Sequence, residues 1–274
     1  AAPGIDLIVG GHSHTAMRAA EEVGSTWIVQ AGEYARNVGV ALAPIEPDSD
    51  WGWERVDLRE TQGPASAEVS ELVATWGQKV EARFEEPVGV VETDLIRAEK
   101  GQTRMGRWAS DLVRHTAAVD VGVYNRGGLR ADLVAGEISL LDLYRVFPFG
   151  NEVVSFEWTG RQLEAVVERG LTDEMSADPA VLQWSGIRYH WVVTEGSPHL
   201  TELWIGDERV DPERVYTIGT NVFVGWQWES LLGVPPRGEL VSHGLTVFEA
   251  AEAAARAGPL RAPVDKRSLL QTSP

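Results

Sequence analysis

The stretch that organises this chain is Asn125-Arg126-Gly127-Gly128-Leu129-Arg130. It follows an apolar run, residues 119–124, that is typical of a buried strand, so the six residues form a turn at a strand end. Two adjacent glycines let the backbone turn tightly and approach a ligand closely. The planar guanidinium of an arginine suits two-point contact with a carboxylate or a phosphate. The stretch is therefore a candidate anion-binding turn, with an ordinary surface turn as the alternative.

The composition is that of a globular protein with an acidic surface. The chain has 274 residues, of which 43% are hydrophobic, and its formal net charge is −17. Such a charge disfavours nucleic acid and anionic membranes, so we expect a small-molecule partner and no nucleic acid. Because there is no cysteine, disulfides and thiolate zinc sites are excluded. No apolar run approaches the roughly 18 residues of a membrane-spanning helix.

The first part of the chain is rich in strands and ends in a helix. The pattern predicts strands at residues 5–9, 26–32, 38–43 and 51–58. It then predicts a helix over residues 67–84, opened by Ser66 as N-cap and stopped by Pro87. We therefore expect three parts, residues 1–62, a connector helix within 63–87, and a second domain over 88–274. Since the chain starts on a strand without an initiator Met, we expect a fragment of a longer protein.

In the second domain, strands and helices interleave irregularly, which indicates an α+β fold with a mixed sheet. The pattern predicts helices at residues 105–116, 140–146, 161–169 and 247–257. It predicts strands at residues 120–124, 152–158, 187–193, 202–205 and 215–219. Residues 221–229 are expected to form a loop, and Phe149 and Asn151 to shape a structural corner.

A second chemical motif, Gly10-Gly11-His12-Ser13-His14-Thr15, ends the first predicted strand. Two imidazoles one residue apart on a sharp turn can reach a single metal ion, since neutral imidazole is a good ligand for first-row metals. The chain has only 6 histidines, and this pair stands at a glycine-flanked strand end. We therefore interpret His12 and His14 as metal ligands.

Several segments, taken in order, carry a resemblance to a known family. They are residues 5–15 and 29–34, then Arg104-Met105-Gly106-Arg107, the stretch from Tyr124 to Arg130, Gly136-Glu137-Ile138-Ser139, Phe147-Pro148-Phe149-Gly150-Asn151, Trp158-Thr159-Gly160, Val210-Asp211-Pro212 and residues 216–221. The chain resembles the bacterial 5′-nucleotidase and UDP-sugar hydrolase branch of the calcineurin-like metallophosphoesterases. The ordered set covers nearly the whole chain, which makes it more specific than any single motif.

The resemblance implies a fold and an activity. The fold would be a mixed-sheet 5′-nucleotidase C-terminal domain, preceded by the last strands of a metallophosphoesterase β-sandwich and a connector helix. The activity would be hydrolysis of nucleotide phosphoesters, with two divalent metal ions (zinc, manganese or similar) in the full-length parent. Family members are usually exported or displayed on the cell surface, which implies a periplasmic, secreted or cell-surface location.

The same resemblance assigns roles to residues. His12 and His14 match the ligands of a Gly-His-Ser-His motif. Asn125 and Arg130, with Gly127 and Gly128 between them, match the turn that holds substrate. The family's other metal-binding motifs, Asp-x-His, Gly-Asp, Gly-Asn-His-Glu and one further histidine, do not occur here. Because two histidines cannot hold a two-metal site, the fragment alone is expected to be inactive.

In the family, two aromatic rings enclose the base. Trp184, in Gln183-Trp184-Ser185-Gly186, takes the place of the first ring, and Gly186 stands where the family has Asn. The second ring comes from a loop that here spans residues 221–229 and lacks the family's Gly-Gly-Asp. Its candidates for that ring are Phe223, Trp226 and Trp228. Glu229 is the candidate for binding the ribose hydroxyls.

One phosphate contact and the substrate itself stay open. The family carries an arginine ahead of the Arg104 segment, where the register puts Glu99, with Arg97 and Lys100 as neighbours. The altered loop at residues 221–229 leaves room for a 2′,3′-cyclic nucleotide or another phosphoester as substrate. A non-catalytic nucleotide-binding module is the alternative from a different class. The metal identity, the preferred base and the oligomeric state are not determined by the sequence.

Overall fold

The computed structural model describes residues 4–43, 51–58, 66–97, 101–174, 182–264 and 267–270. It divides into two compact units, Ala1–Trp76 and Gly77–Pro274, each with its own internal contacts. The predicted boundary at residues 62 and 63, and also Glu99 and Lys100, lie outside the described residues. Within those residues, no helix combines the length and the apolar character needed to cross a membrane.

The first unit contains a three-stranded sheet and a hairpin. The sheet has the order β1-β3-β2, with β1 (Leu7–Val9) parallel and β2 (Glu21–Val23) antiparallel to β3 (Thr26–Val29). The hairpin pairs β4 (Asn37–Leu42) with β5 (Gly52–Asp57). These are the predicted strands in slightly different bounds, whereas β2 was not predicted because its two glutamates interrupt the apolar pattern.

Helix α1 (Ala67–Phe84) has the predicted bounds. The hydroxyl of Ser66 accepts a hydrogen bond from the Val69 backbone N–H at 3.4 Å, so Ser66 caps the helix as its residue type indicates. Pro87 is not a simple stop signal but the first residue of β6 (Pro87–Val91).

The second unit is built around a five-stranded sheet with the order β10-β7-β14-β9-β15. Its strands are β7 (Val121–Asn125), β9 (Glu152–Thr159), β10 (Leu182–Ser185), β14 (Val215–Asn221) and β15 (Arg237–Thr246). Strand β14 runs parallel to β7 and antiparallel to β9, and the remaining pairs are antiparallel. The predicted mixed sheet is therefore confirmed.

Further elements cover this sheet. The helices are α2 (Arg104–Ala117), α3 (Leu140–Val146), α4 (Gly160–Glu174), α5 (Val222–Trp226), α6 (Trp228–Leu231) and α7 (Val247–Ala257). A second sheet, of order β13-β12-β11-β16, consists of β11 (Ile187–Thr194), β12 (Ser197–Ile205), β13 (Glu208–Arg209) and β16 (Ser268–Leu270). Strands β6 and β8 (Gly136–Ser139) form a separate antiparallel pair.

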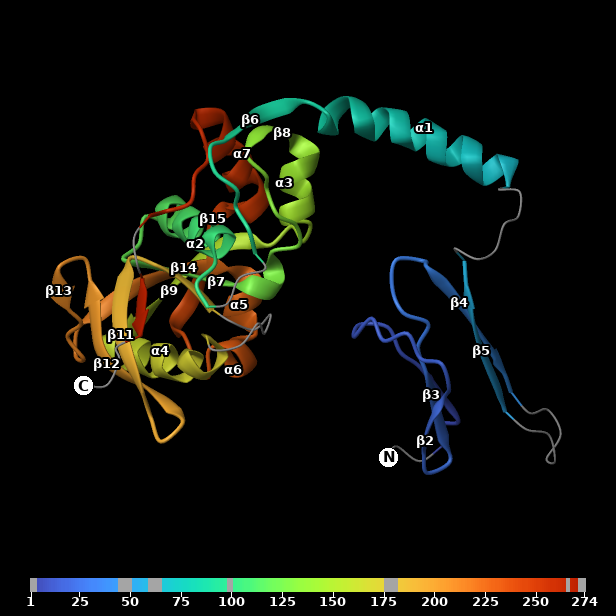
Figure 1. Ribbon diagram of the computed structural model, residues 1–274, viewed down its shortest axis with the longest axis horizontal. Helices are drawn as coiled ribbons and strands as arrows, with labels where there is room; N and C mark the ends of the chain where they lie inside the picture. The colour runs from blue at the N-terminus through green and yellow to red at the C-terminus, as the bar shows by residue number, and fades with distance from the viewer. Residues whose placement is uncertain are drawn as a thin grey trace. The chain divides into compact units, whose positions relative to one another are not determined.

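Alternation along β7 separates two hydrophobic cores. Tyr124 belongs to the core formed with α2, α3 and α7, whereas Val121 and Val123 belong to the core formed with α4 and the second sheet. Figure 1 accordingly shows α2 and α4 on opposite sides of the central sheet. Because both faces of the sheet are covered, only its edges and the connecting loops are available to a ligand.

The segment at residues 221–229 differs from the prediction, because it forms α5 and the start of α6 in place of a loop. The side-chain oxygen of Asn221 accepts a hydrogen bond from the Val224 backbone N–H at 3.1 Å and caps α5. The valines and Gly225 disfavour a helix on propensity alone. The cap and the packing of Val224 in the second core outweigh this preference.

Gly186, between β10 and β11, is held by two constraints. Its φ is +80°, and an added Cβ would lie 2.3 Å from the Asp120 carbonyl oxygen. We expect Gly186→Ala to lower the free energy of unfolding by about 3 kcal/mol, through the backbone conformation and the collision. Gly196→Ala is the matched control, since Gly196 has φ +82° but an added Cβ there would meet nothing within 4 Å. It should lose only about 1 kcal/mol in urea denaturation. Equal losses would show that the collision with Asp120 is relieved at no cost.

Candidate functional site

The candidate site lies at one edge of the central sheet. Because β7 and β14 are parallel, their carboxyl ends, Asn125 and Asn221, reach the same edge. The first residues of β9 lie there too, since Val153 pairs with Asn221. Ligands of open α/β sheets bind outside the carboxyl ends of parallel strands, where successive loops meet. The turn that follows β7 and the helix that follows β14 therefore lie at the same end of the sheet, and together they are the candidate site.

A hydrogen bond between two asparagines ties these two loops together. The Asn125 side-chain oxygen accepts from the Asn221 side-chain nitrogen at 3.2 Å, and both residues are buried. Since Asn221 also caps α5, the contact couples the orientation of α5 to the turn after β7. The sequence predicts that Asn125 contacts the substrate. In the structure, its side chain forms the hydrogen bond that joins the two loops.

Gly128 is required by the protein's own packing. An added Cβ would lie 2.9 Å from the side-chain oxygen of Asn125 and 3.0 Å from the ring of Tyr124. Residues Arg126–Gly128 form a single 3₁₀ turn that lies against these two side chains. Burial raises the pKa of the Tyr124 phenol far above its ordinary value, so this group remains protonated near neutral pH. The close backbone approach that the two glycines predicted is thus made, at Gly128, to Asn125 and Tyr124.

Arg130 is the exposed cation of this turn. Its guanidinium lies 5.9 Å from the centre of the Phe149 ring and donates to the Gly127 carbonyl oxygen at 3.4 Å. Its backbone N–H donates to the Val146 carbonyl oxygen at 3.0 Å. In the described part of the chain, no carboxylate lies within ion-pair distance of Arg130. An aromatic face and a carbonyl therefore orient its charge without neutralising it.

Arg97 places a second guanidinium beside the same turn. It donates to the Leu129 carbonyl oxygen at 3.3 Å, and its Nε lies 3.8 Å from the Asp132 carboxylate. From the sequence, Arg97 is only a neighbour of Glu99, and Phe149 is expected to shape a structural corner. In the structure the Phe149 ring is 50% exposed and supports Arg130. The arginine content of the segment was the only available signal for Arg97.

The aromatic candidates after β14 differ in exposure. Phe223 is 43% and Trp226 is 71% exposed on α5. Trp228 is partly buried and packs against the second core. Glu229 is exposed in the first turn of α6. Phe223 and Trp226 therefore have free ring faces, and Trp228 has a packing role.

Trp184 lies in the core of the second unit. It is 2% exposed, and every residue of β10 is buried between α2 and the second core. The indole consequently offers no face on which a base could stack. Its position argues against the stacking role that the sequence suggested. A single Trp in a four-residue strand carries no signal that distinguishes a packed ring from an exposed one.

The predicted metal ligands belong to the first unit. The turn Gly11–His14 is closed by a hydrogen bond from the His14 backbone N–H to the Gly11 carbonyl oxygen, 3.0 Å. The amide nitrogen of Gln30 donates to the Ser13 hydroxyl at 2.7 Å, and Nδ1 of His14 lies 2.6 Å from the Glu33 carboxylate. Because β1 and β3 are parallel, the segments after them meet at one edge and make these contacts.

The contact with Glu33 has the arrangement usual for a metal-binding histidine. A carboxylate on Nδ1 fixes the tautomer and directs Nε2 to a metal ion. The described residues hold no group of three or more His, Cys, Asp or Glu side chains placed to bind a metal. Among the described residues, His12 and His14 therefore do not complete a metal site, and their role as ligands stays a prediction.

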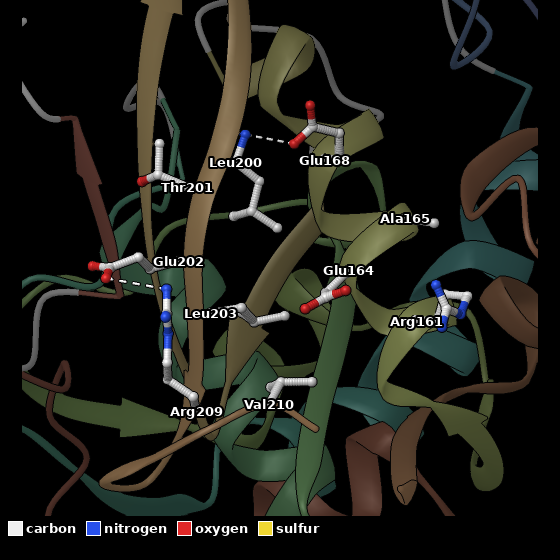
Figure 2. Close-up of a pocket in the computed structure, with 10 residues that line it drawn as sticks. All are labelled: Arg161, Glu164, Ala165, Glu168, Leu200, Thr201, Glu202, Leu203, Arg209 and Val210. Atoms are coloured by element: carbon white, nitrogen blue, oxygen red, sulfur yellow. Dashed lines mark hydrogen bonds and ion pairs between the residues drawn. The ribbon is translucent and has the colours of Figure 1, made fainter. Parts of the chain in front are cut away.

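A separate cavity of about 650 Å³ lies between α4 and β12 (Figure 2). Its charged lining residues are Arg161, Glu164, Glu168, Glu202 and Arg209. Both arginines are paired with carboxylates, Arg161 with Glu213 at 2.6 Å and Arg209 with Glu202 at 3.1 Å. The remaining charge is negative, so this cavity does not suit a phosphate.

Comparisons with known proteins agree with this architecture. A family model described as the 5′-nucleotidase, C-terminal domain, matches residues 82–229. The chain is 28% identical over 248 residues to the trifunctional nucleotide phosphoesterase protein YfkN of Bacillus subtilis, covering 81% of this chain and 17% of that protein. It is 27% identical over 258 residues to protein UshA of Escherichia coli, covering 78% of this chain and 45% of that protein. The chain therefore spans less than half the length of each.

Solved structures show the same fold. The 5′-nucleotidase precursor of Thermus thermophilus matches with a TM-score of 0.66 at 22% identity, over 99% of this chain and 60% of that one. The NAD nucleotidase of Haemophilus influenzae matches with a TM-score of 0.55 at 17% identity, over 98% of this chain and 63% of that one. Both likenesses support the α+β fold with mixed sheets described above.

Proposed function

Because the chain belongs to the 5′-nucleotidase C-terminal domain family, we propose that it is the substrate-binding part of a metal-dependent hydrolase of nucleotide phosphoesters. The observation that carries the proposal is the sheet edge where Arg130, free of any described carboxylate, lies beside a turn tied to α5. In a chain of net charge −17, such an uncompensated cation at a ligand-binding edge favours an anionic substrate.

In this proposal the substrate phosphate binds to Arg130, and Arg97, whose charge is balanced by Asp132, lies beside the same turn. Charge-assisted hydrogen bonds to phosphate are short and strong, and a planar fork can make two at once. The Phe149 ring and the Gly127 carbonyl oxygen hold the Arg130 guanidinium in place. Asn125, Gly127 and Gly128 act by shaping the turn from which Arg130 extends.

The nucleoside binds along α5. Phe223 and Trp226 provide the exposed rings for the base, since stacking requires only an open aromatic face. Glu229 accepts hydrogen bonds from the ribose hydroxyls, because an ionised carboxylate has two acceptor oxygens. Gly186 faces the protein's own backbone and makes no contact with the base.

The metal part of the site rests on His12 and His14, with Glu33 orienting His14. Two divalent ions, when bound, activate a water molecule and polarise the phosphate ester. The residues of this chain supply two imidazole donors to that site, and the ligands that complete it come from elsewhere in the parent protein. The fragment therefore binds nucleotides without turnover.

Adenosine isolates the stacking contribution, because it has no phosphate. Phe223→Ala combined with Trp226→Ala should weaken adenosine binding at least tenfold, given about 1–3 kcal/mol per stacked base. Isothermal titration calorimetry on the folded chain measures this. Trp204→Leu, on β12, is the aromatic control and should bind adenosine normally. Undiminished binding by the double variant would show that α5 does not bind the base. If the unmodified chain does not bind adenosine at all, the proposal of a nucleotide substrate is wrong.

A further inference from the structure

A second cavity, of about 380 Å³, lies at the opposite end of β10 from the proposed substrate site. Its lining includes Asp111, Arg114, Gly186, Arg188 and Arg267. In the antiparallel pairing, Leu182 at the start of β10 lies opposite Asn125, whereas Ser185 at its end lies opposite Gly122. The cavity therefore opens at the other edge of the sheet, and its volume is within the usual range for a small ligand.

The charge of this lining is positive. The lining contains three arginines, Arg114, Arg188 and Arg267, but a single carboxylate, that of Asp111. The Asp111 carboxylate is paired with Arg267, which donates to its two oxygens at 2.7 and 2.8 Å. The Ser185 hydroxyl donates to the same carboxylate. This pair is neutral. The charges of Arg114 and Arg188 remain.

Arg114 is oriented but not neutralised. Its Nε donates to the Asp120 carbonyl oxygen at 2.9 Å, which leaves its two terminal nitrogens for a ligand. The Asp120 carboxylate is turned to Thr217, whose backbone N–H and hydroxyl both donate to it at 2.9 Å. Gly186 leaves the space that Arg114 needs, since an added Cβ would lie 2.7 Å from the Arg114 Nε.

Arg188 approaches from β11. Its guanidinium lies 4.8 Å from the centre of the Trp204 ring, a contact that holds the group over the ring and leaves its charge uncompensated. Across the described ranges, neither Arg114 nor Arg188 has a carboxylate within ion-pair distance. The cavity between α4 and β12 differs in this respect, since both of its arginines form ion pairs with glutamates.

We propose that this cavity binds a small dianion, of the phosphate or dicarboxylate class, between Arg114 and Arg188. Two arginines that line one cavity, with no described carboxylate beside either, make its lining positive, and an anion bound there would neutralise them. Two planar guanidinium groups approaching from different elements match the tetrahedral oxygens of phosphate. The site is separate from Arg130 and does not depend on the proposed function.

The test uses inorganic phosphate and the Arg130→Ala chain, so that the turn at the substrate edge lacks its exposed arginine. Equilibrium dialysis with radiolabelled phosphate at low salt should show uptake of one equivalent. Arg188→Ala and, separately, Arg114→Lys should each weaken uptake about tenfold, since each loses a charge-assisted, two-point contact. Melting by circular dichroism checks that both variants fold, and Arg188 is exposed enough for its removal to leave the fold intact.

Arg209→Ala is the matched control. Arg209 also lies over the Trp204 ring, at 5.9 Å, but it lines the acidic cavity and pairs with Glu202. Its removal should leave phosphate uptake within twofold of the parent. Competition by malonate then separates a dicarboxylate site from a phosphate site. Absence of uptake by the Arg130→Ala chain, or equal uptake by the Arg188 and Arg209 variants, would overturn the proposal.

Discussion

Arg130→Ala will weaken AMP binding to this chain by roughly 10- to 100-fold, because charge-assisted hydrogen bonds contribute about 1.5–3 kcal/mol. Arg130 is the exposed cation of the turn after β7, and only an aromatic face and a carbonyl oxygen orient it. The loss of affinity should affect only ligands that carry a phosphate. Adenosine, which lacks it, should bind the variant and the parent equally in calorimetric titration.

Two further variants separate charge, geometry and fold. Arg130→Lys keeps the charge but not the planar fork, so its AMP affinity should fall between those of the parent and the alanine variant. Arg145→Ala removes another exposed arginine, one that pairs with Asp142 in the same helix, and should change nothing. If AMP and adenosine weaken together, Arg130 supports the loop and does not contact the phosphate.

Arg267→Leu will lower the free energy of unfolding by about 3 kcal/mol, because it breaks a buried ion pair. The Arg267 side chain is only 3% exposed and binds both oxygens of Asp111. It also donates to the carbonyl oxygens of Arg107, at 3.1 Å, and of Trp184. Removal takes the Arg267 donor away from two backbone carbonyls and leaves the largely buried Asp111 carboxylate without a counter-charge, with only the Ser185 hydroxyl donating to it, which costs more than the lost attraction alone. Urea denaturation followed by circular dichroism measures the change.

The control is Arg261→Leu, because Arg261 pairs with Glu92 at 3.8 Å with both side chains well exposed. Its removal should cost no more than about 1 kcal/mol. Replacing both members of the buried pair, Arg267→Leu with Asp111→Leu, should recover part of the loss, since no charge then remains unpaired. A loss below about 1 kcal/mol for Arg267→Leu would mean that solvent reaches Asp111 readily.

Elements with a strong local pattern were predicted within a residue or two. Helices α1, α3 and α7 have the predicted bounds, because their apolar periodicity and capping residues act within one or two turns of chain. The ordered motifs also identified the α+β fold, which the sheet topology confirms. The short strands β2 and β10 were missed, since they are stabilised by pairing with distant strands and carry little pattern of their own.

The sequence by itself determined the family, the mixed α+β fold and the presence of an arginine turn after β7, because these depend on local pattern and ordered motifs. Only the tertiary structure decided which side chains of that family pattern are exposed to a ligand. In the fold, Trp184 is buried in a core, and the Asn125 side chain is hydrogen-bonded to Asn221. Arg97 lies against the turn that carries Arg130, and the Phe149 ring lies beside the Arg130 guanidinium. The physical reason is that exposure and charge pairing depend on strands and loops that are distant in sequence but adjacent in the sheet.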